Sequence, residues 1–379
     1  MGRSYDRYAP TVKTKRTGPK SIYRIGKIGD RPLSEPLRVA TPISQALRYG
    51  ITAPSPHNSQ PWLIELISDT EARLLFDPRR QLSEADPPGR QGHIGHGTLI
   101  EMTSIGATSL GYRCDVEVLP DGDMAVSEFG TKPTAVLRLV RETGLSVDPL
   151  FSQVLARRCS RLPHHGPPLN REEQRHIEAQ ARIEWVAVGW VSSDHFLSVL
   201  DIAARAMAIE VNDFAVFDET LRWFRFSDRE IIDKGDGLDL DTAGLSGLPL
   251  SLARIFTRPG NWHQGYNRGP YLKAFVDSVR TTRALLTITT STNSMRDWIA
   301  AGRSYVRAEL SANELGLRFQ PISQALQEYP QMDEVRTELE RLMGLVAPAK
   351  LQMLVRVGRT KQPALSPRRE LSSIVMNPN

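Results

Sequence analysis

The sequence predicts an α+β fold in which one chain contains two similar halves that form an internal pseudo-dimer. Three observations lead to this expectation. Apolar runs of strand length alternate with intervals of helical periodicity, the chain is long enough for more than one domain-sized unit, and one spaced motif occurs twice. The chain has 379 residues, of which 40% are hydrophobic, so it can bury a large core.

The apolar runs have the length of β-strands. They lie at 62–67, 73–76, 135–140, 185–190, 284–290 and 352–357. Helical periodicity between them favours helices layered on a sheet. Residues 233–270 differ, because they are rich in glycine, proline and short apolar words. Such a long connection predicts a lid-like insertion over a site.

A repeat of four spaced residues suggests the two halves. The segments 97–112 and 302–317 each place Gly, Ala, Leu and Gly at relative positions 0, 10, 13 and 14. Each copy is typical of a helix that ends at a glycine, because glycine enters the left-handed conformation without a side-chain clash. Four matches can also arise by chance, but we favour a duplicated domain. The matched residues are Gly97, Ala107, Leu110 and Gly111 in one copy and Gly302, Ala312, Leu315 and Gly316 in the other.

The predicted organisation is a basic, disordered arm at 1–35, a first half at 36–147 and a second half at 148–379, which includes the insertion at about 233–270. Residues 1–20 hold six basic residues and one acid, which accounts for the net charge of +5. A basic tail can hold a polyanion, but no recognised binding motif accompanies it. We therefore expect no specific nucleic-acid partner.

Composition excludes several other classes. No apolar stretch approaches the roughly 18 residues that a membrane span needs, and the first twenty residues lack the apolar core of a secretory signal. Two cysteines, Cys114 and Cys159, are too few for a disulfide framework. These features predict a cytoplasmic protein with reduced thiols and no membrane partner.

Motifs of other enzyme classes are missing or incomplete. The sequence has no nucleophile elbow, no glycine-rich dinucleotide motif after a strand and no P-loop. His93 and His96, with His164 and His165, could suggest a metal site. They lack the carboxylate and helical context of a zinc hydrolase, so we expect surface or capping roles and no metal.

The stretch APSPHNSQPW at 53–62 is a polar, proline-stiffened loop placed directly before a strand. Further blocks that accompany it are DPPGRQGHIGHG (86–97), RRCSRLP (157–163), LRWFRF (221–226), AGRSYVRAEL (301–310), LGLRFQPISQ (315–324) and LVRVGRTKQPALSPRRE (354–370). Together, over roughly residues 38–372, they resemble the FMN-dependent nitroreductase-like superfamily, and in particular its dormancy-associated Acg-type branch with two fused nitroreductase-like halves.

The resemblance implies one FMN site per chain, assembled from both halves. The Pro-Ser loop lies in the first half, whereas the Arg run RRCSR that binds phosphate in the family opens the second. Cys159 stands where the family has Ser or Thr, which puts a hydroxyl contact to phosphate in doubt. Ser55 and Asn58 are therefore expected close to Arg157 and Arg161. The full set of expected cofactor-binding residues is Pro54, Ser55, Asn58, Gln60, Arg157, Arg158, Cys159, Arg161, Arg368 and Arg369.

The function implied is an oxidoreductase that passes hydride from NADPH or NADH, through FMN, to a small nitroaromatic or quinone-like acceptor. No catalytic side chain is expected, because the flavin carries the redox chemistry. A chain that contains both halves of the family's dimer could be a monomer or a weak homodimer. The alternative is a flavin-binding or flavin-storing protein with little turnover, whose site is covered by the insertion. Cys159, among three arginines, would have a lowered pKa if exposed, which leaves a redox sensor as a minor hypothesis.

Overall fold

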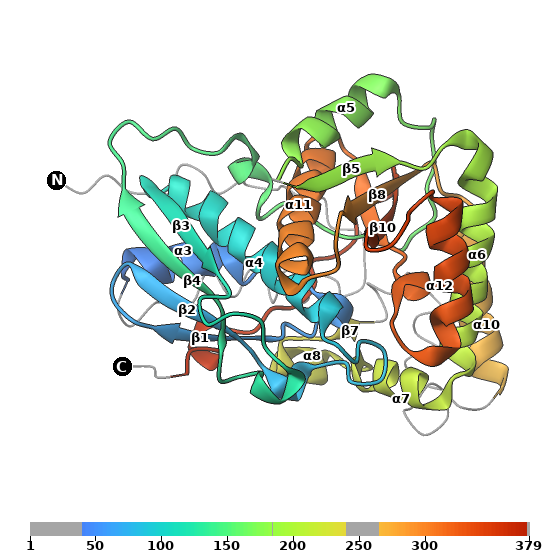
Figure 1. The fold of residues 1–379 in the computed structure, drawn as a ribbon, viewed down its shortest axis with the longest axis horizontal. Helices are drawn as coiled ribbons and strands as arrows, with labels where there is room; N and C mark the ends of the chain where they lie inside the picture. Colours follow the sequence, from blue (N-terminus) through green and yellow to red (C-terminus); the bar gives the residue numbers. More distant parts are fainter. Residues whose placement is uncertain (1–39, 184, 240–264, 377–379) are drawn as a thin grey trace.

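The computed structural model describes residues 40–183, 185–239 and 265–376. Over these ranges the chain forms two four-stranded sheets, with two long helices, α4 and α11, packed together at the centre of the molecule (Figure 1). The predicted basic arm at 1–35 and residues 240–264 of the predicted insertion lie outside the described residues. No helix of the described part is long and apolar enough to cross a membrane.

The first sheet and its helices come from residues before Glu142. These elements are α3 (Pro42–Gly50), β1 (Trp62–Leu66), β2 (Glu71–Phe76), α4 (Arg90–Thr108), β3 (Tyr112–Val118) and β4 (Pro133–Arg141). The strand order is β1-β2-β4-β3, and all neighbours pair antiparallel.

The second sheet and its helices follow in the chain. These elements are α5 (Arg171–Gln180), β5 (Val186–Trp190), α6 (Ser193–Asn212), α7 (Phe214–Arg222), α8 (Asp228–Lys234), α10 (Gly265–Val279), β8 (Ala284–Thr290), α11 (Met295–Glu314), β9 (Arg318–Pro321), α12 (Asp333–Leu342) and β10 (Lys350–Gly358). The order is β5-β8-β10-β9, again antiparallel, and a parallel pair of short strands, β6 (Phe224–Arg225) and β7 (Leu238–Asp239), lies outside this sheet.

The two sheets share one topology. In each, a helix joins the second strand to the third, and the last strand in the chain lies between the second and third strands in space. After both helices the chain turns at a glycine with positive φ, Gly111 (φ 78°) and Gly316 (φ 72°). The prediction of an α+β fold with two similar halves is therefore confirmed, and the repeated helix and glycine are equivalent elements. The boundaries 36–147 and 148–379 stay a prediction.

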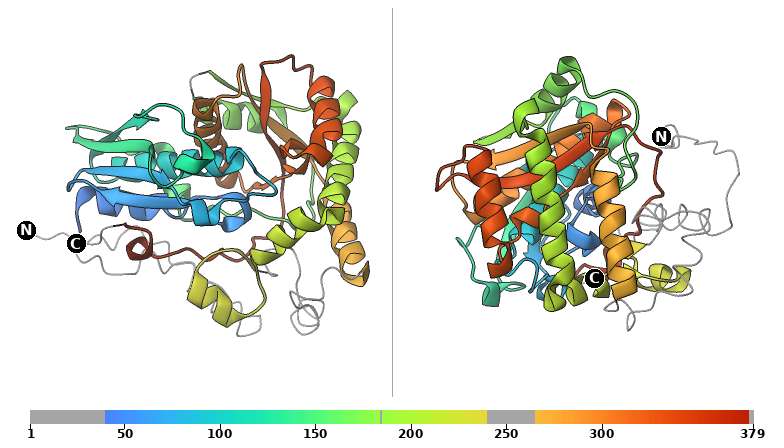
Figure 2. Two further views of the ribbon diagram at one scale, coloured as in Figure 1. Left: turned by 60° about the horizontal axis from the view of Figure 1, so that its bottom comes forward. Right: turned by 90° about the vertical axis from the view of Figure 1, so that its right-hand side faces the viewer.

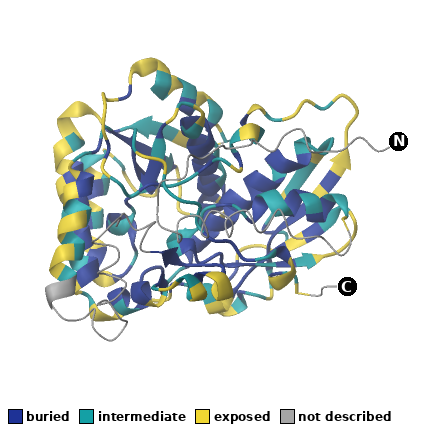
Figure 3. Cartoon of the chain, turned by 180° about the vertical axis from the view of Figure 1, so that it is seen from behind, coloured by how far each residue is buried: buried dark blue, intermediate teal, exposed yellow. Residues whose placement is uncertain are grey.

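The helices α4 and α11 cross where the repeat places its first glycine. A Cβ on Gly97 would lie 2.0 Å from the Ile299 carbonyl oxygen, and a Cβ on Gly302 would lie 1.9 Å from the Ile94 carbonyl oxygen. The two backbones are therefore in direct contact, which only glycine allows at these positions. Most residues of both helices are buried (Figure 3). Glu101 of α4 pairs with Arg303 (2.8 Å) and Arg307 (2.9 Å) of α11 beside the crossing.

The two faces of the second sheet are covered by different helices. Leu286 and Ile288 belong to the core that includes α11, whereas Leu285 and Leu354, on the opposite face of the sheet, pack with residues of α6 and α12. Alternating side chains point to opposite faces of a strand, so an apolar run buried on both faces is expected for such a sheet. Figure 2 shows α6, α10 and α12 on the side away from the first half.

The chain after β10 returns to the first half. The Ile64 N–H donates to the Ile374 carbonyl oxygen (2.9 Å), and the Met376 N–H donates to the Ile64 carbonyl oxygen (2.8 Å). This segment therefore extends along β1, the edge strand of the first sheet, as Figure 2 also shows. On its way it carries residues 359–373 past the loop at 53–61, so a second-half segment lies beside a first-half loop.

We predict that Gly97→Ala and Gly302→Ala each destabilise the protein by about 2–4 kcal/mol, because a methyl group would collide with a carbonyl oxygen that belongs to the facing helix backbone. Urea unfolding followed by circular dichroism measures this difference. Gly269→Ala in α10 is the matched control, since its Cβ would meet nothing within 4 Å. Equal stability of Gly97→Ala and Gly269→Ala would contradict the close crossing.

Candidate functional site

The loop at 53–61 has an unusual backbone. His57 (φ 49°), Asn58 (φ 52°) and Gln60 (φ 51°) all occupy the left-handed region, which is costly for residues with a side chain. Local hydrogen bonds hold this shape, because the Ser55 hydroxyl accepts from the Gln60 N–H (2.9 Å) and the Ser55 carbonyl oxygen accepts from the Asn58 N–H (3.0 Å). The loop is therefore a fixed structure.

Helix α4 packs against the loop and bonds to it. The Thr98 hydroxyl donates to the Pro54 carbonyl oxygen (2.6 Å), and the His96 ring nitrogen Nε2 bonds with the Pro61 carbonyl oxygen (2.7 Å). A Cβ on Gly95 would lie 3.4 Å from the Ser55 Cβ. Within the sequence block GHIGHG, Gly95 and His96 thus contact the loop and help to position it.

The C-terminal segment packs on the other side of the loop. Arg368 donates to the Asn58 side-chain oxygen (2.9 Å) and to the Thr52 carbonyl oxygen (3.0 Å). The Arg369 N–H donates to the Gln60 side-chain oxygen (2.9 Å). Both arginines are at least 90% buried. Four of the expected site residues, Asn58, Gln60, Arg368 and Arg369, are therefore in direct contact.

The end of α8 joins the same cluster. The Asn58 side-chain amide donates to the Gly237 carbonyl oxygen (3.1 Å), and the Gln60 amide donates to the Gly235 carbonyl oxygen (2.9 Å). The Gly237 N–H donates back to the Asn58 carbonyl oxygen (3.1 Å). A Cβ on Gly235 would lie 2.8 Å from the Arg368 carbonyl oxygen, so glycine is required for this approach. The start of the predicted insertion is thus bonded to the loop.

The Arg run contributes from the second half. Arg157 donates to the Thr52 carbonyl oxygen (3.2 Å), which Arg368 also reaches, and forms an ion pair with Glu309 of α11 (3.0 Å). Arg161 lies close enough to His57 for its charge to act on that ring. The structure therefore brings the expected first-half loop and the expected Arg run together.

The side chains of two expected site residues, Arg158 and Cys159, bond to nearby groups of the second half. The Arg158 side chain donates to the nearby Ala156 carbonyl oxygen (2.6 Å). The Cys159 thiol donates to the Glu309 carboxylate (3.0 Å) and lies 3.8 Å from the Tyr305 hydroxyl oxygen. Burial and the neighbouring Glu309 charge raise the pKa of Cys159 to about 11. A lowered pKa is expected only for an exposed thiol, and burial, followed by the Glu309 charge, outweighs the adjacent guanidinium here.

Electrostatics mark Arg368 as the unusual cation of the cluster. Among the described residues its side chain bonds only to neutral oxygens, those of Asn58, Thr52, Ser366 and Pro367. Its Nε has no hydrogen-bond partner. Burial, followed by repulsion from Arg157, lowers the pKa of Arg368 to about 9. A buried guanidinium without a carboxylate partner is costly, and an anion at this point would offset the cost.

Of the four histidines considered above, His165 is exposed, whereas His93, His96 and His164 are buried. His93 and His96 are fully buried on α4 and stack near Phe76, with ring centroids 5.1 Å apart in both pairs. Burial lowers the pKa of His93 to about 4 and that of His96 to about 3, so both are neutral at pH 7. The expected surface or capping roles are wrong for these two. The described residues contain no group of three or more potential metal ligands.

Sequence reasoning missed Thr52, Glu309, Gly235 and Gly237. Thr52 and the two glycines act through backbone carbonyl oxygens, which leave no pattern in the side chains. Glu309 stands inside the quoted block AGRSYVRAEL, but nothing in that helical pattern distinguishes a buried counter-ion from a surface acid.

The chain is similar to known proteins of the kind that the motifs indicate. No protein-family model matches the chain. A protein of Mycobacterium tuberculosis H37Rv named "Putative NAD(P)H nitroreductase Rv3131" is 26% identical over 342 residues, which is 89% of this chain and 91% of the relative. The chain is therefore similar, over most of its length, to a protein named as a nitroreductase. A second relative from that organism, named "Putative NAD(P)H nitroreductase acg", is 28% identical over 126 residues, 33% of this chain and 37% of the relative.

The resemblance to the Acg-type nitroreductase-like branch is therefore confirmed. Among solved structures, the FMN- and NADPH-dependent nitroreductase NfnB from a Sphigopyxis strain matches with a TM-score of 0.38 and 14% identity, over 60% of this chain and 98% of that chain. A nitroreductase-like family protein from Bacillus cereus matches with a TM-score of 0.35 and 11% identity, over 60% and 95%. These structural likenesses are too distant to carry a conclusion about function.

We predict that Cys159 reacts slowly with iodoacetamide at pH 8.5, because a raised pKa leaves little thiolate. In a Cys114→Ser background, Glu309→Gln should increase the rate at least about tenfold, since it removes the charge that opposes thiolate formation. Glu314→Gln, on the exposed end of the same helix, is the control. Rates that are equal in the two variants would contradict the Glu309–Cys159 contact.

Proposed function

We propose that this protein is an FMN-dependent oxidoreductase that takes hydride from NADPH or NADH and passes electrons to a small nitroaromatic or quinone-like acceptor. The similarity to relatives named as NAD(P)H nitroreductases extends over 89% of the chain. The observation that carries the proposal is the contact between the Pro-Ser loop and the C-terminal arginine segment, through Asn58, Gln60, Arg368 and Arg369. These are residues that the family resemblance assigns to one flavin site.

Arg368 is the side chain best suited to hold the FMN phosphate. It is 7% exposed, and among the described residues it has no carboxylate partner and its Nε has no hydrogen-bond partner. A phosphate dianion is the natural partner for such a group. Arg157 already has Glu309 as its counter-ion, so in our proposal it fixes the Thr52 end of the loop and adds a single N–H to the site. The residues present therefore fit the phosphate end of FMN.

The protein's own groups supply position and exclude water. Bound FMN would supply the hydride chemistry, which the side chains described here cannot perform. Ser55, Asn58 and Gln60 hold the loop in its strained shape, so its backbone groups are fixed before any ligand enters. Burial, assisted by the Arg161 charge, lowers the pKa of His57 to about 4. His57 is therefore neutral at pH 7 and acts as a packing group rather than a proton donor.

We further propose that one chain forms the whole site. The central contact that two subunits would otherwise make lies between α4 and α11 of the same chain. A monomer is then sufficient for flavin binding, and the acceptor is a small molecule that reaches the site from solution.

The proposal predicts that purified protein binds one FMN per chain, measured by absorption spectroscopy and by quantifying the released flavin. Arg368→Gln should weaken FMN binding about tenfold to a hundredfold, because a charged hydrogen bond to phosphate is lost. Arg229→Gln, at a side chain that is 91% exposed, removes the same charge elsewhere and serves as the control.

Turnover is measured as oxidation of NADPH and NADH by the flavin-loaded protein with and without a nitroaromatic or a quinone. Hydride transfer predicts acceptor-dependent oxidation of at least one donor. Failure with both donors, in protein that holds its FMN, would sink the enzyme proposal and leave flavin binding intact.

The second candidate function is flavin binding or storage with little turnover. It is favoured by the hydrogen bonds from Asn58 and Gln60 to the carbonyl oxygens of Gly237 and Gly235, which fasten the start of the predicted insertion onto the loop. A segment held there would restrict access by a nicotinamide.

This candidate predicts that replacing residues 240–263 with a short Gly-Ser linker accelerates flavin reduction by NADPH about tenfold or more. Reduction by dithionite, a small reagent, should change little and so controls for damage to the site. Identical NADPH rates in both proteins would argue against a cover over the flavin.

A further inference from the structure

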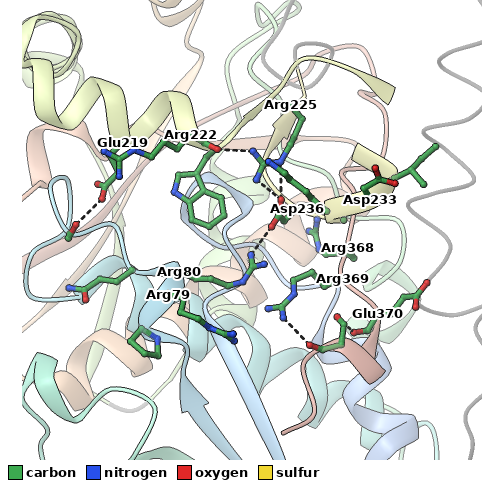
Figure 4. Close-up of a pocket in the computed structure, with 18 residues that line it drawn as sticks. Arg79, Arg80, Glu219, Arg222, Arg225, Asp233, Asp236, Arg368, Arg369 and Glu370 are labelled. Atoms are coloured by element: carbon green, nitrogen blue, oxygen red, sulfur yellow. Dashed lines mark hydrogen bonds and ion pairs between the residues drawn. The ribbon is translucent and has the colours of Figure 1, made fainter. Parts of the chain in front are cut away.

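A large polar cavity lies beside the loop, on the outer side of Arg369. Its volume is about 1060 Å³, at the upper end of the range of small-molecule sites. Three segments form its walls: residues 78–83 after β2, residues 219–236 from the end of α7 through α8, and residues 368–373 of the C-terminal segment. Both halves of the chain therefore contribute to it, as Figure 4 shows.

The cavity is rich in positive charge. Seven of the described residues that line it are Arg or Lys, and four are Asp or Glu. Two of the acids already bond to other groups of the protein. Asp236 pairs with Arg80 (2.8 Å) and Arg225 (3.0 Å), and the Glu219 carboxylate accepts from the backbone N–H of Ala85 (3.0 Å). Arg79, Arg80, Arg222 and Arg225 are paired with carboxylates as well. The attraction for an anion therefore comes from Arg368, Arg369 and Lys234, which pair with no carboxylate of the described residues.

Arg369 is only partly satisfied by the described residues. It is 9% exposed and donates one side-chain hydrogen bond, to the Ser373 carbonyl oxygen (3.0 Å), while its Nη1 has no partner among them. In Figure 4 the Arg80 guanidinium is turned toward Asp236, its ion-pair partner. Arg80 still lies close enough for its charge, after burial, to lower the pKa of Arg369, to about 10. An anion within reach of both guanidinium groups would convert this repulsion into attraction.

An aromatic ring stands next to these cations. The Trp223 ring centroid lies 5.8 Å from the guanidinium carbons of both Arg80 and Arg225, and the side chain is only partly buried. A half-exposed indole in a cavity wall gives a flat surface on which a purine ring can stack. Lys234, in the last turn of α8, adds a flexible ammonium at the rim.

We propose that this cavity binds a nucleotide, with a phosphate group between Arg369 and Arg80 and the base against Trp223. Arg368 also lines the cavity, but its guanidinium bonds to Asn58 and Thr52, so the proposed phosphate position at Arg369 differs from the one at Arg368. Two sources have this chemistry: the phosphorylated adenosine of NADPH, or a free nucleotide. Only the first source rests on the oxidoreductase proposal, and binding itself does not.

Isothermal titration calorimetry of the full-length protein, with and without added FMN, tests the site with 2′,5′-ADP, 5′-AMP and adenosine. At least one phosphorylated probe should bind at least about tenfold more tightly than adenosine, since a charged hydrogen bond to phosphate is lost in adenosine. Competition separates the sources. Displacement of 2′,5′-ADP by NADPH but not by NADH identifies the donor, whereas 5′-AMP binding that neither dinucleotide affects identifies a free nucleotide.

Two variants change residues that line the cavity, Lys234 and Trp223. Lys234→Gln should weaken the bound nucleotide about threefold to tenfold, and Trp223→Leu about tenfold through lost stacking. Lys273→Gln, on an exposed face of α10 outside the cavity, is the matched control and should bind like the parent protein. Lys234→Gln keeps the test valid if Trp223→Leu fails to fold.

Several results would overturn the assignment. They are no heat of binding with any phosphorylated probe at millimolar concentration, inorganic phosphate binding as tightly as 2′,5′-ADP, or affinities that neither Lys234→Gln nor Trp223→Leu changes. Failure of the oxidoreductase proposal looks different, because nucleotide binding would persist without FMN binding or turnover. Both sets of measurements use the same full-length protein.

Discussion

The structure depends on the crossing of α4 and α11 at Gly97 and Gly302. At this point two helix backbones touch, so each half buries its central helix against that of the other half. Neither helix could present a polar outer face in a separate half, because most of its residues are buried. The loop before β1, the Arg run and the C-terminal segment therefore meet at a junction whose geometry the crossing fixes. A change of a few ångströms in this crossing would shift Arg157 relative to Thr52.

Around the junction, backbone carbonyl oxygens do as much positioning as side chains. The Thr52 carbonyl oxygen is reached by Arg157 and Arg368, and those of Gly235 and Gly237 accept from the two amide side chains of the loop. Left-handed residues at 57, 58 and 60 raise the free energy of the loop, so it requires these partners to persist. The strain and the buried cation Arg368 are both compatible with a site that is completed by an anion.

Much of the architecture could be predicted from the sequence, because long apolar runs and the spaced glycines are strong local signals. All six expected strands form, and Gly111 and Gly316 adopt the expected left-handed conformation. The strands β3 and β9 were missed, since YRCDVEV mixes charges into its alternation and RFQP is short. The site was only partly predictable. Its side chains could be assigned from motifs, whereas the Glu309 counter-ion, the buried histidines and the raised Cys159 pKa depend on tertiary packing that no local pattern encodes.

The scaffold is nearly symmetric, but the loops placed on it are not. Before β1 the chain uses eleven residues, 51–61, with Ser55, Asn58 and Gln60 among them, whereas only 181–185 separate α5 from β5. The shorter connection has no serine or asparagine to build the same loop. The duplicated scaffold thus has two equivalent positions, and only the one before β1 carries the Ser55–Asn58–Gln60 loop. Because the C-terminal segment also follows β1 rather than β5, Arg368 and Arg369 lie beside this loop. This asymmetry is the physical reason to expect one flavin per chain.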